Sequence, residues 1–119
     1  MALMERVCVL KSLASLGLDE NEAHIYLYLT NEGPQKAINI GKALNVSTQR
    51  IYRSLKKLQI KGVVNASSEH PACFSAVPFD IVLDLFVKAK IEVAKHLIES
   101  KEELLSTWRS LTERDEEKS

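Results

Sequence analysis

Apolar residues near the start of the chain recur with the spacing of helices. From residue 3 to residue 16 they come at three- and four-residue steps, which is one face of a helix. This helix should end near Ser15, because Gly17 can adopt the left-handed geometry of a helix end. Asp19 and Glu22 then form a capping-box pattern, so a second helix is predicted from this box to about Asn31.

Residues 34 to 62 have the pattern of two short helices joined by a tight turn. The first carries small and apolar residues on one side and should end around Asn45, which tolerates left-handed geometry. Ser47 is a suitable N-cap for the second, in which Ile51, Leu55 and Leu58 follow the spacing of a buried stripe. A helix-turn-helix is therefore predicted.

A hairpin and one long helix complete the pattern. Residues 63 to 77 give two short strand-like runs around a Ser-Glu-His-Pro turn, and from Pro78 the chain continues without Gly or Pro to about Glu113, with Asp80 as the expected N-cap. The predicted fold is mainly α with a small β-hairpin, a winged helix-turn-helix followed by a long C-terminal dimerisation helix. We expect a winged-helix domain with its N-terminal helix at residues 1–78, and the long helix with an acidic tail at 79–119.

Apolar residues in the long helix alternate four- and three-residue steps, the pattern of a coiled-coil seam. Lys101 interrupts this seam and is most simply a lysine that sets the register or extends to solvent. The candidate dimerisation residues are Val87, Ile91, Ala94, Ile98, Leu105 and Trp108. We expect a homodimer, and the repeat is compatible with both parallel and antiparallel pairing.

The distribution of charge says more than its sum. Sixteen basic residues balance sixteen acidic ones, which favours neither a nucleic-acid nor a membrane partner. Between Glu32 and Glu69, however, there is no acid, and seven residues are Lys or Arg. A solvated helix face usually mixes both signs, so this segment favours a polyanionic partner, although an ordinary solvated face remains the alternative.

The basic side chains of the fourth helix lie opposite its buried stripe. Arg can bridge guanine O6 and N7 and Gln can bridge adenine N6 and N7, so Gln49, Arg50 and Arg53 are expected to reach base edges. Tyr52, Lys56 and Lys57 are expected to hold backbone phosphates. The full set of candidate DNA-binding residues is Ser47, Thr48, Gln49, Arg50, Tyr52, Arg53, Lys56, Lys57, Lys36 and His70.

Two features fit a DNA surface poorly. The hairpin tip carries Glu69 and a mostly neutral His70, so we expect only a weak contact there, through Ser67, Ser68 or protonated His70. Ile60 also falls on the outer face of the fourth helix.

Other kinds of chemistry find little support in the sequence. No Ser-His-Asp arrangement or Gly-rich phosphate loop is present, so the protein is not expected to be an enzyme, and no metal site or cofactor is predicted. Cys8 and Cys73 are expected to be buried thiols. The first ten residues contain Glu5 and Arg6, which argues against a signal peptide or a membrane span and indicates a cytoplasmic protein.

Three stretches, "LGLDENEAHIYLYL", "GPQKAINIGKALNVSTQRIYRSLKKLQIKGVV" and "FSAVP", resemble the TrmB-type archaeal transcriptional regulators over residues 13 to 80. The resemblance implies a dimeric winged-helix DNA-binding protein and places Gln49, Arg50, Tyr52 and Arg53 on the recognition helix. Long family members carry a C-terminal sugar-binding effector domain, and wings of the family often carry Arg or Lys near the tip. We expect a short form without that domain; an effector ligand is left open.

Two functions are therefore considered. The first is a homodimeric, sequence-specific regulator of transcription that binds double-stranded DNA, with recognition helix 47–61 in the major groove. The second is a winged-helix protein-interaction module in a heteromeric complex without duplex DNA binding. Ile60, the acidic wing tip and the broad apolar stripe of the long helix favour the second.

Overall fold

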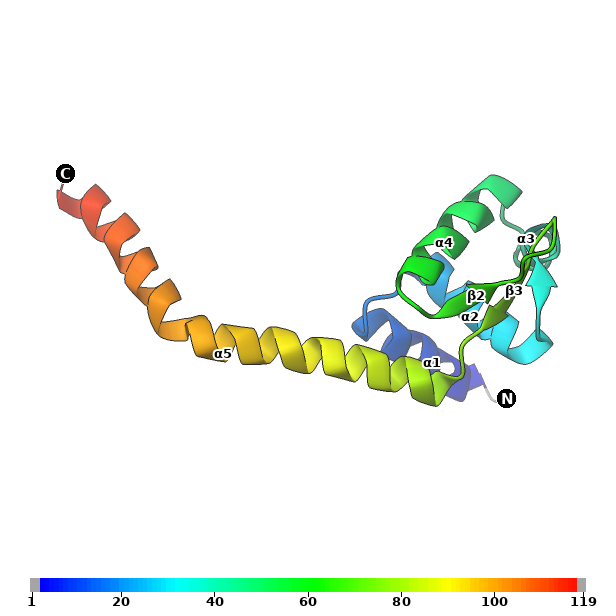
Figure 1. Cartoon of the computed structure of the whole chain (residues 1–119), viewed down its shortest axis with the longest axis horizontal. Coiled ribbons are helices and arrows are strands. Elements are labelled where there is room, and N and C mark those ends of the chain that lie inside the picture. Colours follow the sequence, from blue (N-terminus) through cyan, green and yellow to red (C-terminus); the bar gives the residue numbers. More distant parts are fainter. Residues whose placement is uncertain (1–2, 118–119) are drawn as a thin grey trace. The chain divides into compact units, whose positions relative to one another are not determined.

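The structure of the protein, a computed structural model, describes residues 3–117, and the side chains of residues 4–113. Its elements are α1 (Leu3–Ser15), α2 (Glu20–Glu32), β1 (Gln35–Lys36), α3 (Ala37–Leu44), α4 (Thr48–Ile60), β2 (Val64–Ala66), β3 (Cys73–Ala76) and α5 (Phe79–Glu117) (Figure 1). The chain divides into two compact units between Asp84 and Leu85, so the first residues of α5 belong to the first unit. The expected fold class, a winged helix-turn-helix followed by a long C-terminal helix, is confirmed.

The helix ends follow the capping signals of the sequence. Before α2, the Glu22 amide donates to the Asp19 carboxylate at 2.8 Å, and the Asp19 amide donates to the Glu22 carboxylate at 3.1 Å, which is the predicted capping box. Asn45 ends α3 in left-handed geometry with φ of 57°. Ser47 caps α4, since its hydroxyl accepts a hydrogen bond from the Arg50 amide at 3.4 Å.

The sheet has one strand more than the predicted hairpin. It is antiparallel with the order β1-β3-β2, and β1 pairs through Gln35 with Phe74 and through Lys36 with Cys73. A two-residue strand shows no alternating pattern, so only its pairing with β3 reveals it. This pairing connects the start of α3 to the wing.

The core of the first unit lies where α2, α3 and α4 meet the wing. Its most deeply buried apolar side chains are Leu13, Ile25, Leu29, Ile40, Ile51, Leu55, Leu58, Val63 and Val82. Burying one such side chain contributes about 1.5–3 kcal/mol, so the predicted stripe of α4 is what holds this helix on the domain.

A buried tyrosine connects α2 to the end of the wing. The Tyr26 hydroxyl donates to the Val77 carbonyl at 2.6 Å. Burial of the ring raises the pKa of Tyr26, and the negative charge of Asp80 adds to this effect, against a lowering by the hydrogen bond with Thr30. The phenol therefore stays protonated and continues to donate to Val77.

Two expectations were wrong. Asp80 does not cap the long helix: the helix begins one residue earlier, and the Pro78 carbonyl accepts from the amides of Ile81 and Val82, both at 3.1 Å. Asp80 instead lies in the first turn, where its charge is favourable to the helix dipole. The cysteines are also not buried, because Cys8 is exposed and Cys73 is partly exposed. Short polar neighbours leave both thiols open despite the apolar stretches around them.

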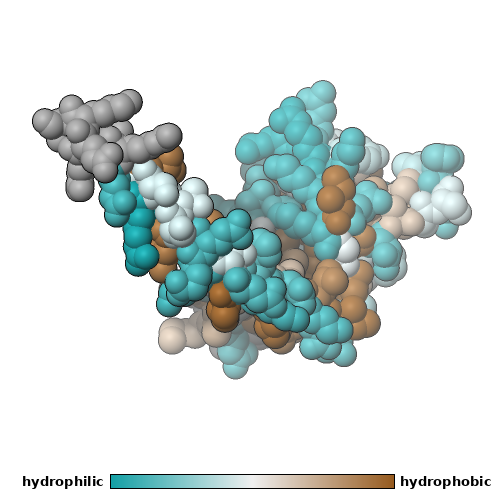
Figure 2. All heavy atoms as spheres, turned by 60° about the vertical axis from the view of Figure 1, so that its left-hand side comes forward, coloured by the Kyte–Doolittle hydropathy of each residue, from teal (hydrophilic) through white to brown (hydrophobic). Residues whose placement is uncertain are grey.

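The second unit is α5 from Leu85 onward, and its apolar residues are exposed in the single chain. Ile98 is 74% and Trp108 65% exposed, and the other seam residues are exposed as well. Apolar (brown) side chains interrupt a mainly hydrophilic surface in Figure 2. Among the described residues, no helix is long and apolar enough to cross a membrane.

Candidate nucleic-acid interface

The turn between α3 and α4 is set by a close backbone approach. A Cβ atom on Gly41 would lie 2.8 Å from the Val46 carbonyl oxygen, so only glycine fits there without a shift. The Val46 amide in turn donates to the Gly41 carbonyl at 2.9 Å. This turn fixes the direction in which α4 leaves α3, and therefore which of its faces meets solvent.

The outer face of α4 is basic and exposed, while its inner face is buried. Ile51, Leu55 and Leu58 are at most 1% exposed. All ten candidate DNA-binding residues are exposed. Eight of them, from Ser47 to Lys57, lie on α4 or at its N-terminus; Lys36 lies on β1, and His70 lies in the loop between β2 and β3.

Tyr52 connects the outer face of α4 to the wing. Its ring meets that of Phe74 on β3 edge to face, with centroids 6.4 Å apart and an interplanar angle of 76°. Tyr52 nevertheless remains 47% exposed. The residue thus fixes the wing strand against α4 and also offers surface to a partner.

One of the seven basic residues is used inside the protein. The Lys61 ammonium lies 2.8 and 2.9 Å from the two carboxylate oxygens of Glu22 and 3.0 Å from the Gly17 carbonyl. Glu22 is buried, so this pair joins the end of α4 to the start of α2. Lys61 therefore adds no net charge to the outer face of α4.

The positive charge of Lys57 is also partly balanced. Burial acts to raise the pKa of Asp19, but hydrogen bonds from Glu22 and the charges of Lys57 and Lys61 outweigh it, so the net pKa is lowered. The uncompensated charge of α4 is consequently concentrated toward its first half, at Arg50, Arg53 and Lys56.

The wing tip is held by hydrogen bonds of its own. The Ser67 amide donates to the Cys73 carbonyl at 2.8 Å, and the Cys73 amide donates to the Ser67 hydroxyl at 2.9 Å. The Cys73 thiol lies 3.9 Å from the Glu69 carboxylate, and Glu69 and His70 are exposed. The tip thus presents a carboxylate beside the histidine.

Residues of α3 extend this surface and were not predicted as part of it. Ile38 and Lys42 line a hollow together with Asn45, Ser47 and Thr48. Their four-residue spacing, opposite the buried side of α3, is the signal that identifies them. In the part of the chain that the structure describes, no cluster of His, Cys, Asp or Glu is suited to hold a metal ion.

A helix-turn-helix with a buried inner face, a basic outer face and an adjoining three-stranded wing defines the protein as a winged-helix DNA-binding regulator of transcription. The family model described as "Sugar-specific transcriptional regulator TrmB" matches residues 13–80. The chain therefore belongs to the TrmB family, as its motifs predicted. This family and the similar structures are transcriptional regulators, not enzymes.

Similar proteins include regulators from archaea. The HTH-type sugar sensing transcriptional regulator TrmBL1 of Pyrococcus furiosus is 34% identical over 76 residues, covering 64% of this chain and 22% of TrmBL1. The structure of TrmBL2, an archaeal chromatin protein with "a novel mode of DNA binding", matches 92% of this chain and 43% of its own, with a TM-score of 0.79 and 21% identity. A possible transcriptional regulator from Methanosarcina mazei matches 76% and 82%, with a TM-score of 0.64 and 17% identity.

The two structural likenesses show the fold. The chain spans about a fifth of the length of TrmBL1 and under half of TrmBL2, so the match concerns the winged-helix part of these proteins and the helix that follows it.

Proposed function

We propose that the protein is a homodimeric, sequence-specific regulator that binds double-stranded DNA with α4 in the major groove. The observation that carries this proposal is the acid-free outer face of α4, exposed over its length while the opposite face is buried. Gln49, Arg50 and Arg53 supply the groups that read base edges, and Lys56 supplies a phosphate contact. The names of TrmBL1 and TrmBL2 support the same activity.

Dimerisation accounts for the apolar seam of α5. Ile98 and Trp108 expose most of their surface in the single chain, and the seam spacing is that of paired helices. Pairing through α5 would give the two α4 helices a fixed separation, which sets the spacing of half-sites at about one DNA turn, ~34 Å.

The direct test is fluorescence anisotropy of a labelled duplex titrated at low salt. Arg53→Ala/Lys56→Ala removes one base contact and one phosphate contact from each protomer, and we expect it to weaken binding by at least about 30-fold. The matched control is Lys95→Ala/Arg109→Ala, which removes the same side-chain types from exposed positions of α5. This control should bind within about threefold of the wild type, because the proposal places no DNA there.

Equal losses in both double variants would mean that binding follows total charge, and the assignment to α4 would be wrong. Sequence specificity needs a separate readout, selection from a pool of randomised duplexes. A motif with two half-sites should emerge from the wild type, and the Arg53→Ala/Lys56→Ala variant should not enrich it.

A second function, a protein-interaction module, is favoured by one observation. Ile60 at the end of α4 is 78% exposed, and Ile38 on α3 is half exposed. Apolar residues on an otherwise basic surface suit an acidic protein partner with apolar side chains of its own. Absence of duplex binding by the wild type at low salt, together with a stoichiometric protein partner lost on Ile60→Asp, would favour this function over DNA binding.

A further inference from the structure

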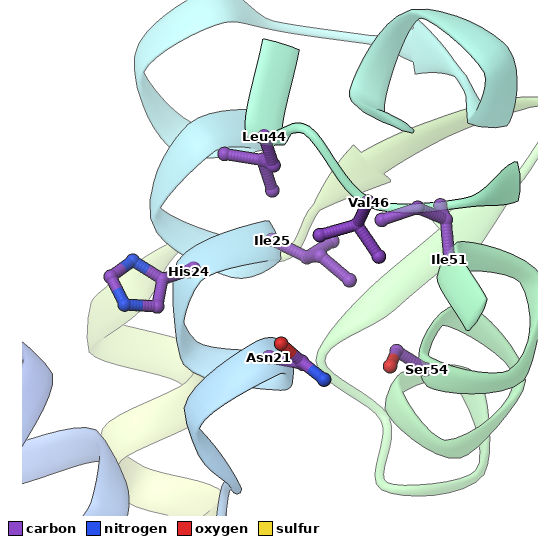
Figure 3. Close-up of a pocket in the computed structure, with 7 residues that line it drawn as sticks. All are labelled: Asn21, His24, Ile25, Leu44, Val46, Ile51 and Ser54. Carbon is purple, nitrogen blue, oxygen red and sulfur yellow. The ribbon is translucent and has the colours of Figure 1, made fainter. Parts of the chain in front are cut away.

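A pocket of about 190 Å³ lies behind α4, on the side of the helix opposite its basic face (Figure 3). Three elements and one turn contribute to its lining, which consists of Asn21, His24, Ile25, Leu44, Val46, Ile51 and Ser54. The pocket belongs entirely to the winged-helix unit. No charged carboxylate or ammonium lines it, so a charged ligand would find no counter-charge there.

The lining has a polar and an apolar part. In Figure 3, Asn21 and Ser54 lie at one end of the pocket, while Ile25, Val46 and Ile51 lie at the other. His24 is at the edge of this group in the view. A ligand suited to this lining has one polar group and one apolar part.

The Ser54 hydroxyl has hydrogen-bonding capacity that the protein does not use. Ser12 and Ser15, also on helices, donate to the carbonyl four residues earlier, at 3.0 Å each. Ser54 is only 8% exposed, yet among the side chains of residues 4–113 neither Ser54 nor Asn21 hydrogen-bonds to another protein group. Buried polar groups are normally satisfied, so these two groups are available to an occupant of the pocket.

The hydroxyl is also reachable. Within the described side chains, no nitrogen or oxygen atom is both fully enclosed and without a hydrogen-bond partner. What remains accessible of Ser54 therefore opens into the pocket that it lines.

We propose that this pocket binds a small uncharged organic molecule that carries one hydroxyl or amide group. Asn21 and Ser54 hold the polar group, and Ile25, Val46 and Ile51 contact the apolar part. Apolar cavities of ~150 Å³ bind benzene, so the pocket suits a molecule of about six to nine heavy atoms. A sugar, with a hydroxyl on nearly every carbon, would place several hydroxyls against the isoleucines without partners.

This site is independent of the proposed DNA binding, because none of its lining residues is a candidate DNA contact. Either proposal can therefore fail without the other.

The test is a titration of the full chain with phenol, followed in an amide proton–nitrogen correlation NMR spectrum. We expect saturable shifts confined to α2, α4 and the turn between α3 and α4, with a dissociation constant of about 1 mM, as befits so small a ligand. Toluene, which has the same size but no hydroxyl, should bind about fivefold more weakly, the loss of roughly one neutral hydrogen bond.

Variants separate the polar contact from general affinity for aromatic compounds. Ser54→Ala should weaken phenol binding about fivefold and leave toluene binding unchanged, since only phenol uses the hydroxyl. Ser106→Ala, at an exposed position of α5, should change neither ligand's binding. The wild-type spectrum serves as the check that each variant folds.

Three results would overturn the proposal. The first is an absence of saturable shifts, which would mean that the pocket holds water only. The second is shifts centred on the apolar face of α5, and the third is equal affinity of the wild type for phenol and toluene.

Discussion

Replacing Lys61 by Met should destabilise the winged-helix unit through a residue on its opposite side. In the wild type the Lys61 ammonium lies 2.8 Å from Glu22, whose side chain is only 2% exposed. The substitution keeps most of the aliphatic chain but leaves the Glu22 carboxylate buried without its counter-charge. Removing one partner of a buried ion pair costs about 3–5 kcal/mol.

The expected loss is smaller than this range. The Lys61 side chain is 34% exposed, so water can reach the carboxylate once the ammonium is gone. Glu22 also keeps its hydrogen bond from the Asp19 amide. We therefore expect the free energy of unfolding to fall by about 2 kcal/mol, between the values of exposed and buried pairs. For a unit of this size the melting temperature should fall by roughly 10 °C.

Urea and thermal denaturation followed by circular dichroism measure this loss, at one fixed protein concentration because the proposed dimer links stability to concentration. Lys57→Met, the same substitution one turn earlier, is the control and should cost no more than about 0.5 kcal/mol. The double variant Glu22→Gln/Lys61→Met should recover part of the loss, because no unpaired charge remains buried. Equal stability of Lys61→Met and Lys57→Met would refute the reasoning.

Three further predictions follow from other parts of the molecule. Gly41→Ala should destabilise the protein by about 1–3 kcal/mol in the same urea assay, because its Cβ would lie 2.8 Å from the Val46 carbonyl oxygen. Asp19→Ala should cost about 1 kcal/mol through the lost cap. Because the pKa of Asp19 is lowered from 3.8 in the folded protein, the charge-dependent part of its contribution is fully present above pH 3.8. This part is lost as pH falls through the folded value, so the gap between wild type and variant should narrow in acid. Ile98→Asp should convert the dimer to monomer in light scattering, whereas Glu99→Asp beside it should not.

Local signals in the sequence were enough to predict the helices. The Asp19–Glu22 capping box, left-handed Asn45 and the Ser47 cap each involve residues within four positions of one another, and all are present in the structure. The buried stripe of α4 was predicted for the same reason, since helical periodicity is a local property.

Contacts between distant residues were not predictable in this way. Strand β1 exists only through its pairing with β3, nearly forty residues later. The ion pair of Lys61 with Glu22 spans 39 positions, and the sequence therefore counted Lys61 as one more cation on a basic segment. The exposed face of α4 was predictable, but which of its charges are balanced from α2 was not.

Surface features of α3 could have been found from the sequence. Ile38 and Lys42 repeat at helical spacing on the side opposite Ala37, Ile40 and Gly41, which are buried. The pocket behind α4, in contrast, depends on how Asn21 and Ser54 are brought together by packing, and no spacing in the sequence indicates it.

The salt dependence of duplex binding tests the central claim most directly. Each phosphate contact contributes about −0.9 to the slope of log K against log salt, so Lys56→Ala, which removes two contacts from a dimer, should flatten the wild-type slope by about 2. Lys95→Ala on α5 should leave the slope unchanged. If instead the Lys56→Ala slope equals that of the wild type, or the wild type fails to bind at low salt, the outer face of α4 is not the DNA-binding surface.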